Sequence, residues 1–300
     1  GKPTYIPNTE VYGNVNKYII SGTFAEVQYR INTTEDKGIL NLQNKKYTAI
    51  NSDSTINVNK NITINGNGAT LDADNKIRIM DIGDGVSVTL KNINLINGKA
   101  PLTTGMAFGG AIDIQSGRIT VINSTFKNNT ANGTDGFGGA ISTDSGRVTI
   151  TNSTFKDNTA SGNYTKGGAI YNNNGDVTVT NSTFKDNTAN GTESGFGGAI
   201  YGGSVTVVDS KFTNCTAKDD GSDIYTSNGN IDLICNDYDG KPTYIPTDEV
   251  EGYVKKYIIS GTFAEVQYRI NETEDKGILN LENKKYTAIN SDSTINVNKN

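Results

Sequence analysis

The 300-residue sequence contains no histidine and no tryptophan. The absence of histidine excludes Ser-His-Asp and Cys-His catalysis and every histidine-ligated metal site. The absence of tryptophan removes the best stacking surface for a sugar ring, although 15 tyrosines remain. An active site made from Asp, Glu, Lys and Arg alone is still open.

The sequence also lacks other features, and each absence argues against a class of protein. The two cysteines are too few for a disulfide-stapled scaffold. A net charge of −5 gives no electrostatic support to nucleic-acid binding, and no basic cluster suggests a membrane anchor. No apolar run approaches the ~18 residues that span a bilayer, and no signal peptide is visible, so any targeting signal would lie outside this window. We therefore expect no nucleic-acid partner and no membrane span here.

The chain contains the opening of its own next copy. Residues 1–61 recur as residues 240–300, at an offset of 239 residues and with seven substitutions. This pattern predicts one full unit and the start of a second, cut from a longer array. Near-identical tandem units suit a stalk or filament, in which length is the product.

A shorter repeat lies inside the unit. Four phenylalanines follow one another at spacings of 29, 29 and 28 residues: Phe126, Phe155, Phe184 and Phe212. Gly-Gly-Ala-Ile blocks keep step with them, and a run of alternating β-branched residues precedes each one. Alternation with a period of two indicates strands, and the glycine pairs between the strands argue against helices.

Three short strands per period predict an all-β fold, a right-handed parallel β-helix solenoid that is tandemly repeated. Equivalent residues would stack ~4.8 Å apart along the axis. We expect an interior phenylalanine column and an interior isoleucine column, the latter from Ile112, Ile141, Ile170, Ile200 and Ile224. Asn129, Asn158 and Asn187 each lie three residues after a phenylalanine, and their amides should bond along the stack as an inward ladder.

A short capping helix is expected before the first coils. Phe24, Val27 and Ile31 fall on one helical face, and Thr23 with Glu26 makes a capping-box pair. Such a helix would close the open end of the solenoid, as terminal caps do in repeat folds. A copy of it follows in the second unit.

The repeat also predicts domain boundaries. They are an inter-repeat linker (1–22), the capping helix with its β-helix unit (23–238), a second linker (239–261), and the capping helix and first strands of the next unit (262–300). The second linker carries Pro242 and Pro246, which would make it semi-rigid. A strand is expected within it at residues 254–259.

The paired signatures resemble known surface proteins. Gly-Gly-Ala-Ile and Phe-x-x-Asn, as at Phe126 and Asn129, resemble the repeats of chlamydial polymorphic outer membrane proteins. The fuller order, from Thr-Phe-Ala-Glu-Val-Gln at 23–28 through the Asn-rich segments at 59–68 and 90–98 to the Gly-Gly-Ala-Ile coils, resembles adhesin-like surface proteins of methanogenic archaea. This resemblance implies a pectate-lyase-like β-helix, an extracellular cell-surface location and an adhesion role assigned largely by analogy. Cys215 departs from the pattern, because it stands where Asn is expected after Phe212.

Enzymatic chemistry has one candidate group. A lyase-like site needs carboxylate-bound calcium and a basic residue, which Asp72, Asp74, Arg78 and Asp81 could supply. Solvent-facing turn residues are the better interpretation, so we expect no enzyme and no cofactor.

Calcium could also be held elsewhere by clustered aspartates. The candidates are Asp219, Asp220 and Asp223, or Asp237 and Asp239. No full calcium-loop signature accompanies them, and simple turns are the better interpretation.

Three further sets of residues are candidate sites. Cys215 and Cys235 are about one coil apart but aligned to different corners, so two buried free thiols are favoured over a disulfide. Among eleven Asn-x-Ser/Thr sequons, the best glycosylation candidates share the widest loops and one azimuth: Asn132, Asn163 and Asn190. An exposed aromatic row that could bind sugars or a neighbouring molecule is expected from Tyr171, Tyr201 and Tyr225, although strand propensity alone explains it more simply.

These observations favour a structural or adhesive module that forms a surface stalk, filament or coat, and the resemblance implies an archaeal source. The expected partners are neighbouring units of the same protein, with surface glycans or other cells as further candidates. A polysaccharide lyase or hydrolase on the same fold, and a self-assembling fibre subunit, are the alternatives.

Overall fold

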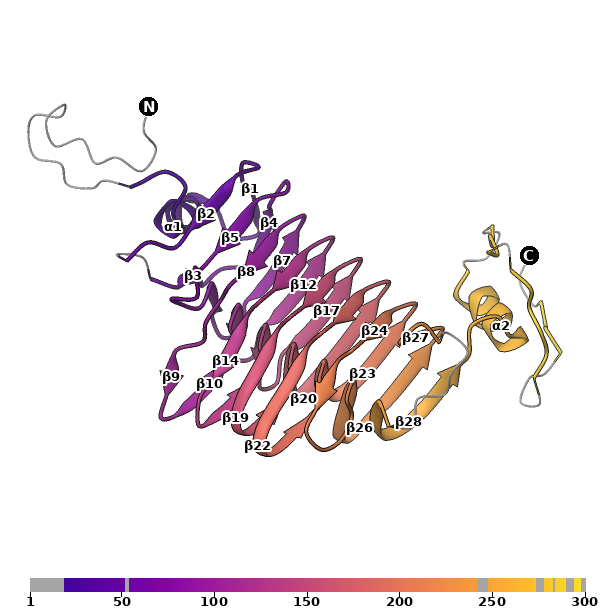
Figure 1. The fold of residues 1–300 in the computed structure, drawn as a ribbon. Coiled ribbons are helices and arrows are strands. Elements are labelled where there is room, and N and C mark those ends of the chain that lie inside the picture. The colour runs from indigo at the N-terminus through magenta and orange to yellow at the C-terminus, as the bar shows by residue number, and fades with distance from the viewer. Residues whose placement is uncertain are drawn as a thin grey trace, which may run out of the picture.

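The structure is a computed structural model, and it describes residues 19–51, 54–241, 248–273, 278–282, 284–289 and 294–297. The chain winds into a parallel β-solenoid whose coils succeed one another from the N-terminal helix to β28 (Figure 1). The predicted all-β parallel solenoid with a short helix at its N-terminal end is confirmed. Most of the expected first linker, including Pro3 and Pro7, lies outside the described residues, as do Pro242 and Pro246.

Three sheets run along the solenoid. The long sheet has thirteen strands, β1 (Gly38–Asn41), β3 (Ile56–Val58), β4 (Ile62–Asn65), β6 (Met80–Ile82), β7 (Ser87–Lys91), β11 (Ile112–Ile114), β12 (Arg118–Ile122), β16 (Ile141–Thr143), β17 (Arg147–Thr151), β20 (Ile170–Thr180), β23 (Ile200–Val208), β26 (Ile224–Ile234) and β28 (Val250–Ile258). The sheet that carries the phenylalanine column, here the Phe sheet, consists of β2 (Lys46–Thr48), β5 (Thr70–Asp72), β8 (Asn94–Ile96), β13 (Thr125–Lys127), β18 (Thr154–Lys156), β21 (Thr183–Lys185), β24 (Lys211–Thr213) and β27 (Asp237–Tyr238). The third, here the arm sheet, consists of β9 (Leu102–Thr103), β10 (Met106–Phe108), β14 (Thr130–Asn132), β15 (Asp135–Phe137), β19 (Thr159–Lys166), β22 (Thr188–Phe196) and β25 (Thr216–Ala217).

Stacking in register builds the core. Phe126, Phe155, Phe184 and Phe212 are fully buried, and their ring centroids lie 4.7, 5.0 and 5.1 Å apart in nearly parallel planes. Tyr238 continues this column at 5.5 Å. The predicted isoleucine column is confirmed in the same register and is fully buried. Because each column fills one side of the interior, the unit needs few apolar residues.

Asparagine and aspartate form the corners on both sides of the Phe sheet. Asn123 and Asn128 flank β13 with φ of 49° and 54°, and the following coils repeat this geometry. Left-handed backbone is costly for most residues but tolerated by Asn and Asp, whose short side chains bond locally. The sequon asparagines Asn123, Asn152 and Asn181 are therefore turn residues.

The inward asparagine ladder is confirmed. Asn129, Asn158 and Asn187 are fully buried. The Nδ2 of Asn129 donates to Oδ1 of Asn158 at 3.0 Å, and that of Asn158 donates to Oδ1 of Asn187 at 2.9 Å. Each amide also bonds backbone groups of adjacent coils, so the polar groups of the ladder are satisfied inside the solenoid.

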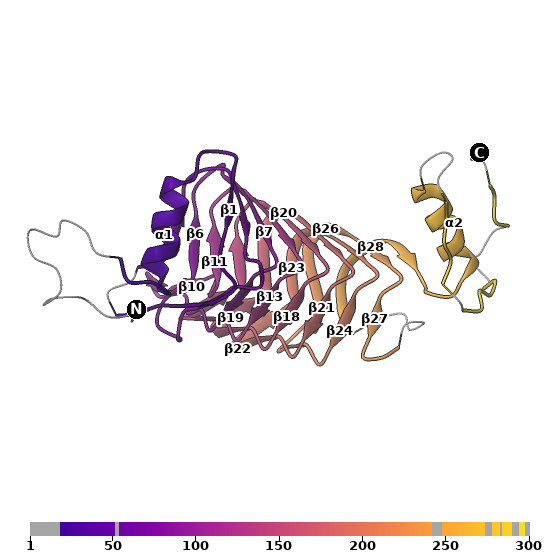
Figure 2. The same cartoon turned by 90° about the horizontal axis from the view of Figure 1, so that it is seen from above.

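The capping helix α1 (Phe24–Thr33) lies across the N-terminal end of the solenoid (Figure 2). Phe24, Val27 and Ile31 are at most 1% exposed, so the predicted apolar face is confirmed. The capping box is only half present in this copy. Glu26 accepts from the N–H of Gly22 at 2.7 Å, but the Thr23 hydroxyl donates to the Ile20 carbonyl and makes no cap bond.

The second copy of the helix, α2 (Phe263–Glu272), follows β28 (Figure 2). Here the Thr262 side chain does accept from the N–H of Glu265, at 3.3 Å. The strand expected at residues 254–259 overlaps the observed β28, which begins four residues earlier and ends at Ile258. That strand extends the long sheet by pairing in parallel with β26, inside the range for which a linker was expected.

We predict that Asn158→Ala lowers the free energy of unfolding by about 3 kcal/mol, because it leaves buried donors and acceptors of two neighbouring coils unpaired. Asn190→Ala, at an exposed site in the arm sheet, should cost less than about 0.5 kcal/mol. Urea unfolding followed by circular dichroism measures both. Equal losses in the two variants would contradict a stabilising role for the ladder.

Candidate functional site

The residues that directly follow the isoleucine column and its register partners Ile56, Met80 and Val250 form a continuous column on the outer face of the long sheet. We call this set the outer column, and in register it comprises Asn57, Asp81, Asp113, Ser142, Tyr171, Tyr201, Tyr225 and Glu251. It brings carboxylates, a hydroxyl and aromatic rings onto one side of the solenoid. Chemistry on this fold would therefore be expected along it.

Side chains from the arm sheet cover part of the outer column. Phe137 lies 5.1 Å from Tyr171, Phe196 lies 4.8 Å from Tyr225, and the Lys166 ammonium lies 4.8 Å from the ring centre of Tyr201. The tyrosines also stack on one another, at 5.5 Å for Tyr171 and Tyr201 and 5.3 Å for Tyr201 and Tyr225. The result is one connected aromatic strip, which Phe108 extends at 5.0 Å from Phe137.

The expected exposure of the tyrosine row is wrong for Tyr171 and Tyr201, and Tyr225 is half-buried. Tyr171 and Tyr201 are 8% and 3% exposed, because the arm sheet packs over them. Burial also raises the pKa of Tyr171 and of Tyr225. Tyr201 lies between the rings of Tyr171 and Tyr225 and beneath Lys166, so its faces are occupied. A sugar binds an aromatic residue by stacking on a ring face, and the strip is therefore a packing element rather than a sugar platform.

The arm-sheet side chains of the strip were not singled out from the sequence. Phe108, Phe137, Lys166 and Phe196 each come directly before a Gly-Gly pair. Parallel pairing holds them in one register. The large side chain before each Gly-Gly is the signal that could have identified them.

The candidate lyase-like residues are divided between two places. Asp72 binds Lys46 at 2.6 Å and Asn97 at 2.8 Å, and Asp74 binds Lys76. Arg78 instead pairs with Asp81 and lies 3.4 Å from Asp113, both in the outer column. The four predicted residues therefore do not converge.

Arg78 fixes the end of β10 in the arm sheet to the long sheet. It is 7% exposed, and its Nε and Nη2 donate to the carbonyls of Gly109 and Phe108 at 3.0 and 2.7 Å. Burial raises the pKa of the half-buried Asp113; the Arg78 guanidinium opposes this rise and the Asp81 carboxylate adds to it. Since its donors hold backbone carbonyls and carboxylates, Arg78 has little capacity left for a substrate.

The aspartates proposed for calcium do not assemble into a metal-binding group, and three of them bind other protein groups. Asp219 accepts from the N–H of Gly195 at 3.1 Å, Asp223 is 4% exposed, and Asp237 pairs with Lys211 at 3.3 Å. Asp239 accepts from the N–H of Asn214. In the part of the chain that the structure describes, no group of three or more His, Cys, Asp or Glu side chains is placed to hold a metal ion.

The cysteines are two free thiols at different corners. Cys215 takes the next place in the inward ladder, where its Sγ accepts from Asn187 at 3.8 Å. Cys235 occupies a left-handed corner with φ of 54°. Burial raises the pKa of both thiols, that of Cys235 to about 12, so neither is an activated nucleophile.

The three glycosylation candidates lie in the arm sheet. Asn132 and Asn190 are exposed and share one register position, through Ser161 of the coil between them. Asn163 does not share that azimuth, and its Oδ1 accepts from the Thr192 hydroxyl at 3.1 Å. Their glycosylation stays a prediction.

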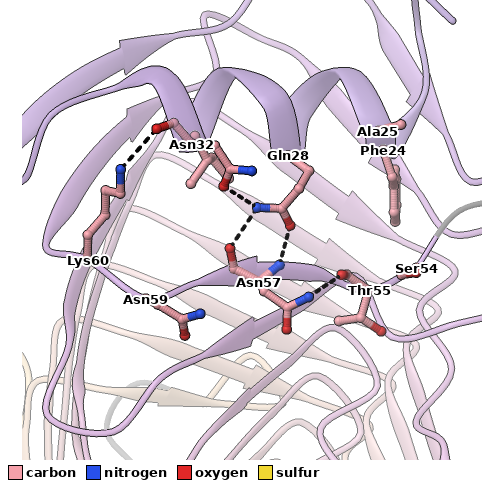
Figure 3. A pocket seen from close by; sticks show the side chains of 10 residues that line it. Phe24, Ala25, Gln28, Asn32, Ser54, Thr55, Asn57, Asn59 and Lys60 are labelled. Atoms are coloured by element: carbon pink, nitrogen blue, oxygen red, sulfur yellow. Dashed lines mark hydrogen bonds between the residues drawn. The ribbon is translucent and has the colours of Figure 1, made fainter. Parts of the chain in front are cut away.

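A side-chain amide closes β3, one of the two strands at the N-terminal end of the long sheet (Figure 3). Gln28 of α1 donates from Nε2 to the Asn57 carbonyl at 3.0 Å and accepts from the Asn57 N–H at 2.6 Å. β3, which contains Asn57, pairs with β6 on its other side, so Gln28 substitutes for a missing strand. In the second copy, Gln267 makes the same two bonds to Asn296, at 3.1 and 2.7 Å. Closing an exposed edge in this way protects it from pairing with other chains.

The position of the cap also depends on Glu26, which is 8% exposed. Its carboxylate accepts from the N–H of Gly22 and from Lys45 and Arg30, at 2.7 to 2.9 Å. Burial acts to raise the pKa of Glu26, but these hydrogen bonds and the two cations outweigh burial and lower the pKa to about 2. The buried Glu26 carboxylate thereby links the start of α1 and the turn before it to Lys45.

Three segments of the chain match the model of the Chlamydia polymorphic membrane protein repeat, at residues 123–144, 152–173 and 181–203. These are three successive coils, each beginning at the left-handed corner before a Phe-sheet strand. The expected resemblance to these repeats is confirmed for those coils. No curated protein and no solved structure matches the chain. Among the described residues, neither helix has the length and apolar character needed to cross a membrane.

We predict that Gln28→Met lowers the free energy of unfolding by about 1–2 kcal/mol, because it removes two hydrogen bonds from the open edge of β3. It should also promote association in sedimentation velocity runs. Gln267→Met is the matched control, since it changes the same residue where no complete solenoid follows within the chain. A loss of solenoid stability as large in Gln267→Met would contradict the edge-closing role of Gln28.

The lowered pKa of Glu26 predicts that the N-terminal cap loses stability in acid. Its pKa is lower in the folded state, so its stabilisation is present above pH 4.5 and is lost as the pH falls toward 2. The expected loss is about 3 kcal/mol. Glu26→Gln should be less stable than the parent at pH 7 and equally stable near pH 2, by urea unfolding across this range. Parallel pH profiles for the two proteins would contradict this role.

Proposed function

We propose that the chain is a section of an extracellular tandem-repeat protein whose β-solenoid units form a stalk, filament or coat at the cell surface. The observation that carries the proposal is the in-register stacking of the coils, which repeats along one axis, together with the return of the capping helix and its contacts in the second copy. The match to polymorphic membrane protein repeats and the solenoid fold are compatible with a surface or structural repeat protein.

The physical properties of the solenoid suit this role. Each coil contacts its neighbours along the axis, so adding coils or units adds length without requiring a larger core. The interior is satisfied by stacked rings, aliphatic side chains and amides, and most of the polar surface faces outward. A rod of this kind provides reach, and its outer surface is available for contact with glycans or other cells.

Adhesive contact would then involve the arm sheet rather than the aromatic strip. The arms project Asn132 and Asn190 into solvent, and glycans at these sequons would coat one side of the rod. We expect neighbouring units of the same protein as permanent partners. An archaeal source would fit the resemblance of the full motif order.

An enzymatic role is not favoured by the arrangement of the outer column. Arg78, the basic residue closest to its carboxylates, is committed to the backbone of Phe108 and Gly109. Asp72 is the last residue of the Phe-sheet strand β5, and Asp74 follows two residues later and pairs with Lys76. Neither residue belongs to the outer column.

Immuno-electron microscopy of intact source cells, with an antibody raised against this chain, tests the proposal. We expect label along thin threads or across a regular surface coat. Soluble antigen in the medium with no label on the cells would overturn it, and glycan depolymerisation assays would then address the lyase or hydrolase alternative.

A further inference from the structure

The strand β28 lies between the last coil of the first unit and the second capping helix. Its residues, Val250–Ile258, correspond to residues 11–19, which precede the first capping helix. The strand pairs with β26 of the first unit, from Ile224 with Val250 to Ile234 with Ile258. The N–H of Cys235 donates to the Ile258 carbonyl at 2.8 Å at the end of this pairing. The segment that leads into the second capping helix thus extends the long sheet of the first unit.

The helix that follows β28 is also bound to the first unit. Arg269 of α2 donates to both carboxylate oxygens of Asp209, at 2.9 and 2.6 Å. The two side chains are 27% and 30% exposed, so the pair is partly shielded from solvent. The hydrogen bond to Asp209 raises the pKa of Arg269, as expected for a bidentate pair.

Asp209 differs from its equivalents in a way that fits this contact. Earlier coils have Asn at the same left-handed corner, where Asn181 donates to Asn152 at 2.7 Å in an outward ladder. An asparagine both donates and accepts, whereas an aspartate only accepts. The change to Asp therefore occurs at the corner that meets a cation from the next repeat.

The first copy shows how this arginine behaves without such a partner. Arg30, the equivalent of Arg269, donates to Glu26 of its own helix at 2.9 and 2.8 Å. Arg269 makes longer contacts to Glu265, at 3.4 and 3.3 Å, and directs its shorter bonds to Asp209. Tyr268 is half-buried with the Lys256 ammonium of β28 at 4.6 Å, whereas its equivalent Tyr29 is 45% exposed.

We infer that successive repeats are joined by a built junction, in which the segment before each capping helix adds a strand to the sheet of the preceding unit and the arginine of that helix clamps the corner aspartate of the same unit. The partner of the surface around Asp209 is thus the next copy of the repeat. This inference rests on the proposed tandem array, and it makes the array a jointed rod with a defined orientation between units rather than a string of independent solenoids.

Hydrogen exchange of the purified 300-residue chain, read by mass spectrometry, tests the junction. Arg269→Gln and Asp209→Asn should each accelerate exchange in α2 by about fivefold, the size expected for a partly exposed ion pair. The double variant should show no further acceleration, because the two residues act on one contact. β28 should remain protected throughout by its pairing with β26.

Two matched controls separate the junction from general effects. Arg30→Gln removes the same side chain from the first helix, and Asp186→Asn makes the same change at a left-handed corner that binds Asn214 instead. Neither should alter exchange in α2. Parent-like exchange of α2 in Asp209→Asn, equal acceleration in Asp186→Asn, or an unprotected β28 in the parent would overturn the inference. Because this measurement uses the isolated chain, it is independent of where the protein is found on cells.

Discussion

In-register stacking of parallel coils is the constraint on which the rest of the structure depends. Side chains at equivalent positions of successive coils lie about 4.8 Å apart. A residue type therefore suits a column only if two copies of it can pack side by side. Phenylalanine does so by stacking, and asparagine does so because one amide donates to the next. Rows of like charges are accommodated on the outside, where solvent screens them. The outward Lys127, Lys156 and Lys185 share one register, and corner aspartates such as Asp157, 3.7 Å from Lys156, moderate their repulsion.

This constraint explains how much could be predicted from the sequence. Columns follow from spacing along the chain, so the phenylalanine, isoleucine and inward asparagine columns were predicted correctly. The burial of Tyr171 and Tyr201 was not, because it depends on where the arm sheet folds back, and alternation within a strand carries no information about a second layer. A buried serine ladder was missed for a related reason. Ser124, Ser153, Ser182 and Ser210 sit beside left-handed corners, where alternation breaks down, and each hydroxyl accepts from the N–H of the preceding coil.

The ends of a solenoid are where stacking stops, and the two ends solve this problem differently. At the N-terminal end, Gln28 offers β3 the donor and acceptor of an absent strand. At the other end, β26 is paired with β28, from the segment that leads into the second capping helix. The Gln28 amide closes β3, whereas β28 extends the sheet toward the next unit. Each device covers a strand edge that could otherwise pair with other chains.

The seven substitutions between the two copies show which part of this design is constrained. Each substituted position that the structure describes in the second copy is exposed: Asp248, Glu251, Tyr253, Lys255, Glu272 and Glu282. Three of these, Glu251, Tyr253 and Lys255, lie in β28. The buried residues of the same strand, Val250 and Ile258, are 6% and 8% exposed and are identical in both copies. If residues 239–261 were only a spacer, substitutions would have no reason to avoid its inward positions. Their distribution is that of a packed strand, and it argues that the boundary between repeats is part of the folded rod.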